Sequence, residues 1–197
     1  MIDAGYNYER LGEKMKWLGL NPKSIDTILI THQDTDHMGA LETDTELLFK
    51  DATIYLSEIE NRYLTAEVRR KVYGGWYKLP LVKTDNKKVL LKDGQILYIG
   101  DIKIECFLVP GHTWGHLCYL IDDKYLFTGD TIWFGPDGGY SFLDALAEEN
   151  ELAKKSLAEF EQKPHDPNAI YDGYNESDDT KENAQNVLLT KVVPVVK

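Results

Sequence analysis

The sequence has little cysteine, comparatively few basic residues and no long hydrophobic run. Its two cysteines, Cys106 and Cys118, lie inside apolar stretches, so they are expected to pack as small hydrophobic residues rather than to form a disulfide framework. No stretch reaches the roughly 20 apolar residues that a membrane-spanning helix needs, and residues 1–5 lack the features of a signal peptide. These absences indicate a cytoplasmic protein that does not bind a membrane.

The excess of acidic over basic residues argues against nucleic acid as a partner. Twenty-two basic residues face 33 acidic ones, which gives a net charge of −11 at pH 7 and a field that repels phosphate backbones. The short basic cluster at residues 69–71 is interpreted as a solvated helix face or loop. With 197 residues and 43% hydrophobic content, the chain is predicted to form a single domain over residues 1–197.

The hydrophobic pattern predicts an α/β (α+β) protein. In the first half, helical spacing ending at Gly19 precedes a buried strand, and Ser57 with Glu60 resembles the capping box of a further helix. The second half has hairpin patterns around residues 100–101 and 122–123. The predicted helices are 8–18, 41–49, 57–72, 143–160 and 181–189, and the predicted strands are 25–31, 53–56, 95–99, 102–109, 117–121, 125–128 and 168–171.

Residues 28–37 contain a candidate metal site. Four side chains with imidazole or carboxylate donors occur within six positions at the end of an apolar, strand-like run, and a tight turn there can aim them at one point. These are His32, Asp34, Asp36 and His37. A solvated polar turn is the alternative, but Met38, Gly39 and Ala40 follow at once and leave little room for a long loop.

Two further strand ends carry similar residues. His112 lies on a glycine-containing turn after an apolar strand, and Asp130 follows Gly129 at the end of another. By themselves, these two residues are equally consistent with a satisfied polar contact and a helix cap, respectively. His116 is spaced from His112 in a way that suits a supporting hydrogen bond as well as metal ligation.

Together these segments resemble the metallo-β-lactamase superfamily, whose signature is His-x-His-x-Asp-His followed by a Gly-His-Thr turn and a Gly-Asp pair. The resemblance spans nearly the whole chain and includes an Asp-x-Gly turn at residues 3–5. It implies an αββα four-layer sandwich that lacks the N-terminal strands. It also implies a first metal held by His32 and His112, a second held by Asp36 and His37, and Asp130 as the bridge.

The sequence departs from the family pattern at two ligand positions. Asp34 replaces the second histidine of the signature, which makes the first site harder and richer in oxygen. The late histidine has no counterpart near residues 170–174, where Asp172 is the best substitute ligand and Tyr174 a candidate oxyanion contact. We therefore expect one or two divalent metal ions, zinc first, with manganese and iron as alternatives.

The resemblance implies a metal-dependent hydrolase. A metal-activated water would attack an ester, thioester, lactone or related small molecule, with Asp36 as the catalytic residue that orients the water. Trp114, Trp133 and Tyr140 follow the ligand turns and are predicted to line the rim of the substrate site, with core packing as the rival interpretation. The alternative hypotheses for the function are a diiron oxidoreductase of the flavodiiron type, a phosphodiesterase, and a metal-poor pseudoenzyme or truncated form.

The start of the chain at the Asp-x-Gly turn leads to one further expectation. Strands that precede this turn in the resembling family would be missing, which would leave an unpaired sheet edge. A homodimer would cover that edge, with the β-prone segment 192–196 as a candidate donor strand. The alternative is that the chain is a fragment of a longer protein.

Overall fold

A computed structural model describes residues 1–42, 48–72, 82–134, 140–141, 146–162 and 169–172. Its helices are α1 (Tyr8–Trp17), η1 (Pro22–Ser24), α2 (Thr35–Met38), η2 (Gly39–Leu41), α3 (Glu58–Leu64) and α4 (Asn150–Glu161). Its strands are β1 (Thr27–Leu29), β2 (Thr53–Ser57), β3 (Lys88–Leu91), β4 (Ile96–Ile99), β5 (Ile102–Leu108), β6 (Leu117–Ile121), β7 (Tyr125–Gly129), β8 (Trp133–Phe134), β9 (Tyr140–Ser141) and β10 (Ala169–Asp172).

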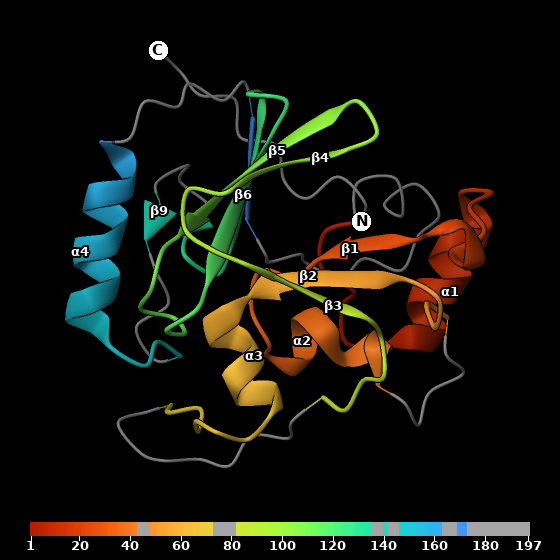
Figure 1. Cartoon of the computed structure of the whole chain (residues 1–197), viewed down its shortest axis with the longest axis horizontal. Helices are drawn as coiled ribbons and strands as arrows, with labels where there is room; N and C mark the ends of the chain where they lie inside the picture. Colours follow the sequence, from red (N-terminus) through yellow and green to blue (C-terminus); the bar gives the residue numbers. More distant parts are fainter. Residues whose placement is uncertain (43–47, 73–81, 135–139, 142–145, 163–168, 173–197) are drawn as a thin grey trace.

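The strands form two main sheets and one small hairpin (Figure 1). The first sheet has the order β1-β2-β3, all parallel, and Ile2 adds a parallel bridge beside Leu29 at its edge. The second sheet has the order β10-β7-β6-β5-β4, in which β4 to β7 are antiparallel neighbours and β10 runs parallel to β7. Strands β8 and β9 pair with each other.

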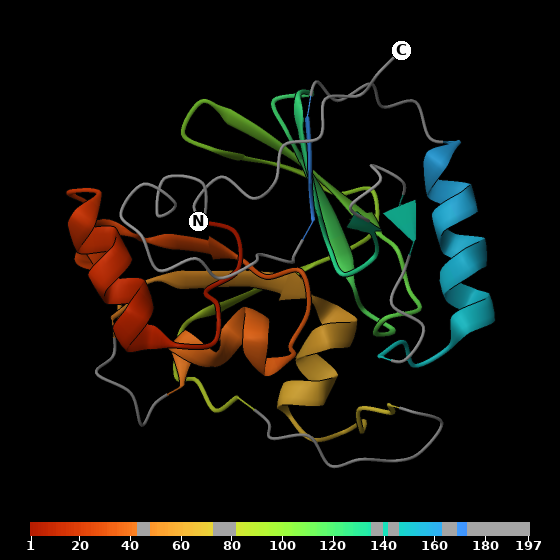
Figure 2. The ribbon, with the colours of Figure 1, turned by 180° about the vertical axis from the view of Figure 1, so that it is seen from behind.

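Helices cover the outer faces of both sheets. Helices α1, α2 and α3 lie on the first sheet, and α4 lies on the second, so that α1 and α4 are at opposite ends of the molecule (Figure 2). Three hydrophobic clusters fill the spaces between these layers, one under each set of helices and one between the sheets. The observed architecture is therefore the predicted αββα four-layer sandwich.

The alternation of side chains along the strands explains the separate clusters. In β1, Ile28 belongs to the cluster beneath the first helices, whereas its neighbour Leu29 belongs to the cluster between the sheets. In β6, Cys118 packs toward α4 and Tyr119 packs between the sheets. Because successive side chains of a strand point to opposite faces, a strand covered on both faces needs apolar residues on each, as Ile28 with Leu29 and Cys118 with Tyr119 provide.

The hairpins form where the sequence predicts them, and the helix boundaries differ. Asp122 and Asp123 both have positive φ angles, of 49° and 56°, which suit a two-residue hairpin turn between β6 and β7. Helix α3 ends at Leu64, well before residue 72, because the chain turns at Ala66 with a φ of 59°. Helix α4 begins only at Asn150, whereas the prediction begins it at 143. The predicted helix 181–189 and the segment 192–196 lie outside the described residues.

Two hydrogen bonds join the sheets next to the strand ends that carry the candidate ligands. The Tyr119 hydroxyl donates to the Ile30 carbonyl at 2.6 Å, and the Leu117 N–H donates to the Thr31 carbonyl at 2.9 Å. These bonds fix the end of β1 against β6 and place the first ligand turn beside the second sheet. Across the part of the chain that the structure describes, no helix is long and apolar enough to cross a membrane.

Candidate metal centre

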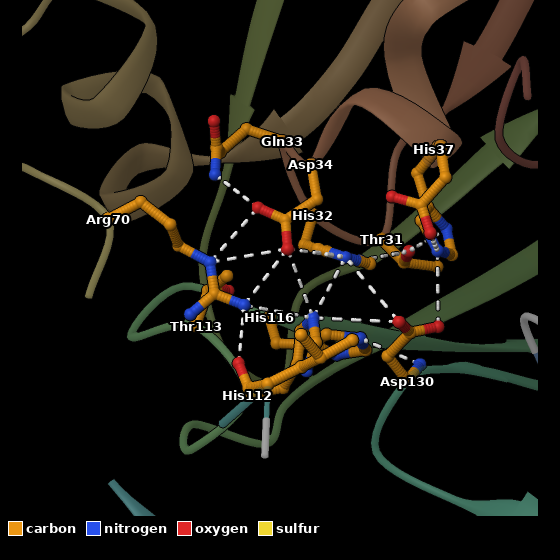
Figure 3. A network of polar contacts seen from close by, with 12 residues as sticks. Thr31, His32, Gln33, Asp34, His37, Arg70, His112, Thr113, His116 and Asp130 are labelled. Carbon is orange, nitrogen blue, oxygen red and sulfur yellow. Dashed lines mark hydrogen bonds and ion pairs between the residues drawn. The ribbon is translucent and has the colours of Figure 1, made fainter. Parts of the chain in front are cut away.

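Three turns bring the predicted ligands together at one edge of the two sheets (Figure 3). The turn after β1 carries His32 and Asp34, the turn after β5 carries His112, and the turn after β7 carries Asp130. His37 joins them from the short helix α2.

Glycines allow two of these turns to approach their neighbours closely. Gly111, with a φ of 146°, precedes His112, and a Cβ atom there would lie 2.3 Å from the Cα atom of Ala153. Gly129, with a φ of 52°, precedes Asp130, and its Cβ would lie 2.7 Å from the Thr31 hydroxyl. Any larger residue would clash at either position, so these glycines are needed to bring His112 and Asp130 to the cluster.

Four donor atoms of this cluster have the mutual separations of a tetrahedral metal site. His32 Nε2 lies 3.1 Å from His112 Nε2, 3.6 Å from Asp34 Oδ2 and 3.8 Å from Asp130 Oδ2. His112 Nε2 lies 3.3 Å from Asp34 Oδ2 and 3.5 Å from Asp130 Oδ2. A tetrahedral zinc ion with bonds of about 2.0 Å separates its ligand atoms by about 3.3 Å. The residues present therefore fit a divalent cation.

A second group of donors adjoins the first. The other carboxylate oxygen of Asp130, Oδ1, lies 3.1 Å from His37 Nε2, and Asp36 Oδ2 lies 3.7 Å from the same nitrogen. Asp36 is 67% exposed, whereas the His37 side chain is only 5% exposed. Asp130 thus offers one oxygen to each group, which is the geometry that a bridging ligand requires.

Asp3 fixes the orientation of His37. Its Oδ2 atom accepts hydrogen bonds from His37 Nδ1 and the Thr31 hydroxyl, both at 2.8 Å, and its Oδ1 accepts from the Thr31 N–H at 2.8 Å. With Nδ1 bonded to Asp3, the Nε2 atom of His37 faces Asp130, as in metal sites where a carboxylate orients a ligating histidine. The Asp-x-Gly turn was noticed in the sequence, but this role of Asp3 was not predicted.

His116 supports Asp130 through hydrogen bonds. His116 Nε2 accepts a hydrogen bond from the Asp130 N–H at 3.1 Å, and its Nδ1 lies 3.2 Å from the Thr131 hydroxyl. Its ring also stacks on His32 with a centroid separation of 4.9 Å. Burial and the neighbouring imidazoles His32 and His112 hold the pKa of His116 well below its usual value. This neutral ring, with both nitrogens engaged, matches the supporting role that its spacing also allowed.

Arg70 is buried in the cluster, and the interpretation of residues 69–71 as a solvated surface is wrong for this residue. Only 1% of its side chain is exposed. Its Nε donates to Asp34 Oδ1 at 3.0 Å, and its Nη2 donates to Asp34 Oδ2 at 2.9 Å and to the Leu146 carbonyl at 2.7 Å. The same Nη2 lies 3.2 Å from His112 Nε2. The basic cluster gave no signal that one member turns inward.

Glu60 is a second buried titratable residue of the site that the sequence did not indicate. The expected capping box is only half formed, because the Ser57 hydroxyl accepts from the Glu60 N–H but the Glu60 carboxylate points elsewhere. That carboxylate accepts from the Gln33 N–H at 2.8 Å, from the Gly115 N–H at 3.0 Å and from the Thr113 hydroxyl. It thus ties the two histidine turns together. Burial raises the pKa of Glu60 to about 8 despite these hydrogen bonds.

The cluster has strongly perturbed protonation in the absence of a cation. Burial raises the pKa of Asp34, but hydrogen bonds with His112, His32 and Arg70 outweigh this effect and hold it well below its usual value. Burial lowers the pKa of His37, but the carboxylates of Asp130 and Asp3 outweigh it and hold the value well above normal. A cation that binds between His37 and Asp130 would take the place of this proton.

The remaining predicted residues are placed less completely. Trp114 follows the histidine turn and is 49% exposed, while its N–H donates to the Tyr63 hydroxyl at 3.3 Å. Trp133 and Tyr140 lie in the paired strands β8 and β9, and the structure does not describe their side chains. Asp172 ends β10 opposite Gly129, so its backbone lies beside the strand that leads to Asp130, but its side chain is also not described. Tyr174 lies outside the described residues.

The four-layer sandwich with a His/Asp cluster at its strand ends defines a class of αββα metalloproteins. The family model described as the metallo-beta-lactamase superfamily matches residues 1–177, and the chain belongs to this superfamily.

Two curated relatives are named as hydrolases. The chain is 29% identical to the "Probable polyketide biosynthesis zinc-dependent hydrolase BaeB" of Bacillus velezensis over 132 residues, which cover 67% of the chain and 48% of that protein. It is 36% identical to the "Hydroxyacylglutathione hydrolase" of Shewanella halifaxensis over 111 residues, which cover 56% of the chain and 35% of that protein. The chain thus matches about half or less of the length of these relatives.

A solved structure agrees with the fold. The protein TTHA1623, described in a di-iron-bound form, superposes with a TM-score of 0.58 at 22% identity, covering 89% of the chain and 81% of that structure. At this level of identity the likeness concerns the fold.

Proposed function

We propose that the protein is a binuclear metal-dependent hydrolase of small-molecule esters, with thioesters as the first class to test. The observation that carries this proposal is the set of five donor-atom separations of 3.1 to 3.8 Å among His32, Asp34, His112 and Asp130. Such buried donors at this spacing suit a cation, and the second carboxylate oxygen of Asp130 suits a second cation at His37 and Asp36.

The relatives support a hydrolase and suggest the substrate class. One is named for zinc-dependent hydrolysis in polyketide biosynthesis, and the other for hydrolysis of hydroxyacylglutathione, whose acyl group is linked to sulfur. The second name describes a reaction on a small molecule. Lactones and other activated esters share the acyl chemistry of a thioester and form the second group of candidate substrates.

Divalent cations bound at these positions would polarise a substrate carbonyl oxygen and lower the pKa of a water molecule, so that water attacks near neutral pH. The chain's residues supply the placement. Asp130 supplies one oxygen to each group of donors. His116 accepts a hydrogen bond from the Asp130 N–H, and Asp3 accepts one from His37 Nδ1.

Asp36 is placed to orient the attacking water. Among the candidate ligands whose side chains the structure describes, its carboxylate is the most exposed. One oxygen can therefore bind the cation next to His37 while the other accepts a hydrogen bond from water. A small pocket beside His112 and Asp130, about 10 Å³ in volume, has room for about one water molecule.

Zinc is the first candidate metal because the relative from Bacillus velezensis is named as zinc-dependent. Iron is the second, because the carboxylate at position 34 adds a hard ligand and a protein of the same fold is described with two irons. Manganese remains the third.

The decisive experiment is elemental analysis of protein purified without added metal, followed by assays with the metal that is found. Thioester, lactone, β-lactam and phosphodiester substrates form the panel. We expect thioester hydrolysis that a chelator abolishes and the metal restores. Protein that binds no divalent cation under any condition would contradict the proposal, and so would a metal-loaded protein that is active only on phosphodiesters.

A further inference from the structure

Asp34 and Arg70 form a buried ion pair at the first group of donors. Three guanidinium–carboxylate contacts of 2.9 to 3.2 Å join them, and the side chains are 12% and 1% exposed. Figure 3 shows Arg70 on the outer side of Asp34, at the opposite end of the network from His37. Arg70 therefore does not lie between the donor groups, and it leaves Asp34 Oδ2 facing the two histidines.

The pair determines the charge that a cation would meet. His32 and His112 are neutral when they donate lone pairs, and Asp34 and Asp130 each contribute one negative charge. The guanidinium is permanently positive and lies 2.9 Å from the same Asp34 oxygen that faces the donors. Because a buried charge at this distance is poorly screened, Arg70 cancels most of the extra negative charge that Asp34 brings.

We propose that Asp34 and Arg70 act as one electrically neutral ligand unit, in which Asp34 supplies the donor oxygen and Arg70 sets the net charge of the first metal site. The inference rests on the metal site of the proposed function. In charge, the unit is equivalent to a single histidine at position 34. Arg70 is thus a positioning residue that acts on the metal through the ligands it contacts, which are Asp34 and also His112, whose Nε2 lies 3.2 Å from Arg70 Nη2. Its burial excludes direct contact with substrate.

The contacts of Arg70 with the rest of the protein offer a competing explanation. Its Nη2 also donates to the Leu146 carbonyl, and its Nη1 lies 3.5 Å from Glu148. On that explanation, the guanidinium fork serves to hold the 146–148 segment and the Asp34 side chain in place. The two explanations predict opposite changes in metal affinity when the arginine is removed.

A set of four variants separates charge from geometry: Arg70→Met, Arg70→Lys, Asp34→His and the double variant Asp34→His/Arg70→Met. Zinc affinity of the metal-free proteins is measured by competition with a chromogenic chelator at fixed pH and ionic strength. Thermal melting of each metal-free protein reports whether it is folded. The binding step at His37 and Asp36 serves as an internal control, because it lies away from Arg70.

The charge unit predicts a specific pattern for the first site. Arg70→Met should bind zinc at least about tenfold more tightly, because the compensating cation is gone, and Arg70→Lys should stay within about threefold of the original protein. Asp34→His should bind at least about tenfold more weakly, because the positive charge of Arg70 then has no carboxylate among the metal ligands to offset it. The double variant should return to within about threefold of the original.

Three results would overturn the proposal. Weaker binding in both Arg70→Met and Arg70→Lys would show that the fork geometry matters and the charge does not. Equal zinc affinities in all four variants and the original protein would show that the charge of Arg70 does not affect the first metal site. If Arg70→Met does not fold, the comparison of Asp34→His with the double variant makes the same test, and a double variant no tighter than Asp34→His overturns the proposal. A parent protein that binds no zinc or other divalent cation would instead reject the proposed function.

Discussion

The two groups of donors in the metal centre differ in how firmly the protein holds them. In the first group, His32, Asp34 and His112 are nearly buried, and Arg70 fixes the carboxylate by a fork of hydrogen bonds. In the second, His37 is held by Asp3, but Asp36 is 67% exposed. The first group is therefore in place before a metal binds, whereas the second group is open to solvent on one side. We expect metal to bind the first half more tightly and substrate to meet the second.

The largest effect should come from the residue that belongs to both halves. Asp130→Ala removes one donor oxygen from each group, so we expect both metal-binding steps to weaken by more than about 100-fold, with turnover falling in parallel. Titration with zinc and the thioester assay measure this. Asp123→Ala, on an exposed hairpin turn, is the control. Loss of only one binding step would show that Asp130 does not bridge.

Asp36→Ala should affect turnover much more than metal binding at the first group of donors. We expect turnover to fall by more than about 100-fold, because the water-orienting carboxylate is lost, while the tighter metal-binding step stays within about threefold of the original. Steady-state kinetics and the same titration measure the two quantities. Retained turnover in a folded, metal-loaded variant would move the water-orienting role to another residue.

Asp3→Asn should weaken only the second half. Its carboxylate orients His37, so losing the charge-assisted hydrogen bond should reduce affinity at the second binding step by about 10- to 100-fold. The first step should be nearly unchanged, because Asp3 reaches His32 only indirectly, through the Thr31 hydroxyl that Asp3 bonds and that lies 3.1 Å from His32 Nδ1. An equal loss at both steps would indicate that Asp3 mainly stabilises the turn after β1.

Glu60 should make the stability of the protein depend on pH, and this effect does not involve His37 or Asp36. Its folded-state pKa of about 8 lies above the usual 4.5, so between these values the folded protein holds a proton that the unfolded chain has released. The free energy of unfolding should therefore fall as pH rises through this window, by up to about 1.4 kcal/mol per pH unit, and level off above it.

Urea unfolding of the metal-free protein across this pH range, compared with Glu60→Gln, checks that slope. Glu58→Gln in the same helix turn is a matched control, because the Glu58 side chain is exposed. The slope should be present in the original protein and in Glu58→Gln, and reduced in Glu60→Gln. Identical slopes in all three would contradict a protonated Glu60.

The smallest effect is expected at the rim. Trp114 is half exposed and its structural hydrogen bond uses only its backbone N–H, so Trp114→Ala should leave both metal affinities and kcat nearly unchanged. If Trp114 lines the substrate site, KM should rise by less than about tenfold. An unchanged KM would remove Trp114 from the rim, and a large loss of metal affinity would show that it supports the histidine turn.

The sequence predicts the parts of the site that depend on local spacing. His32, Asp34, Asp36 and His37 lie within six positions, so a single turn after a strand is enough to gather them. The turns that carry His112 and Asp130 were recognisable by glycines next to the ligand. The hydrophobic pattern predicted the mixture of helices and strands and the two hairpins, whereas the four-layer sandwich was implied by the resemblance to the superfamily.

The supporting residues could not be predicted because their partners are distant in sequence. Arg70 meets Asp34 across 36 positions, and Glu60 meets Thr113 across 53. A charged residue that will be buried and paired looks the same in sequence as one that faces water. For Glu60 the local pattern was also misleading, since the capping-box spacing with Ser57 is present but the carboxylate is used elsewhere.

The long sequence separation of the first ligands has a consequence for folding kinetics. His32 and His112 meet across 80 positions, and Tyr63 meets Glu148 across 85, so these pairs form only after large loops have closed. A cation that requires the completed cluster has little to bind in the folding transition state. We therefore expect zinc to leave the refolding rate nearly unchanged and to slow unfolding, so that the bound metal extends the lifetime of the native state.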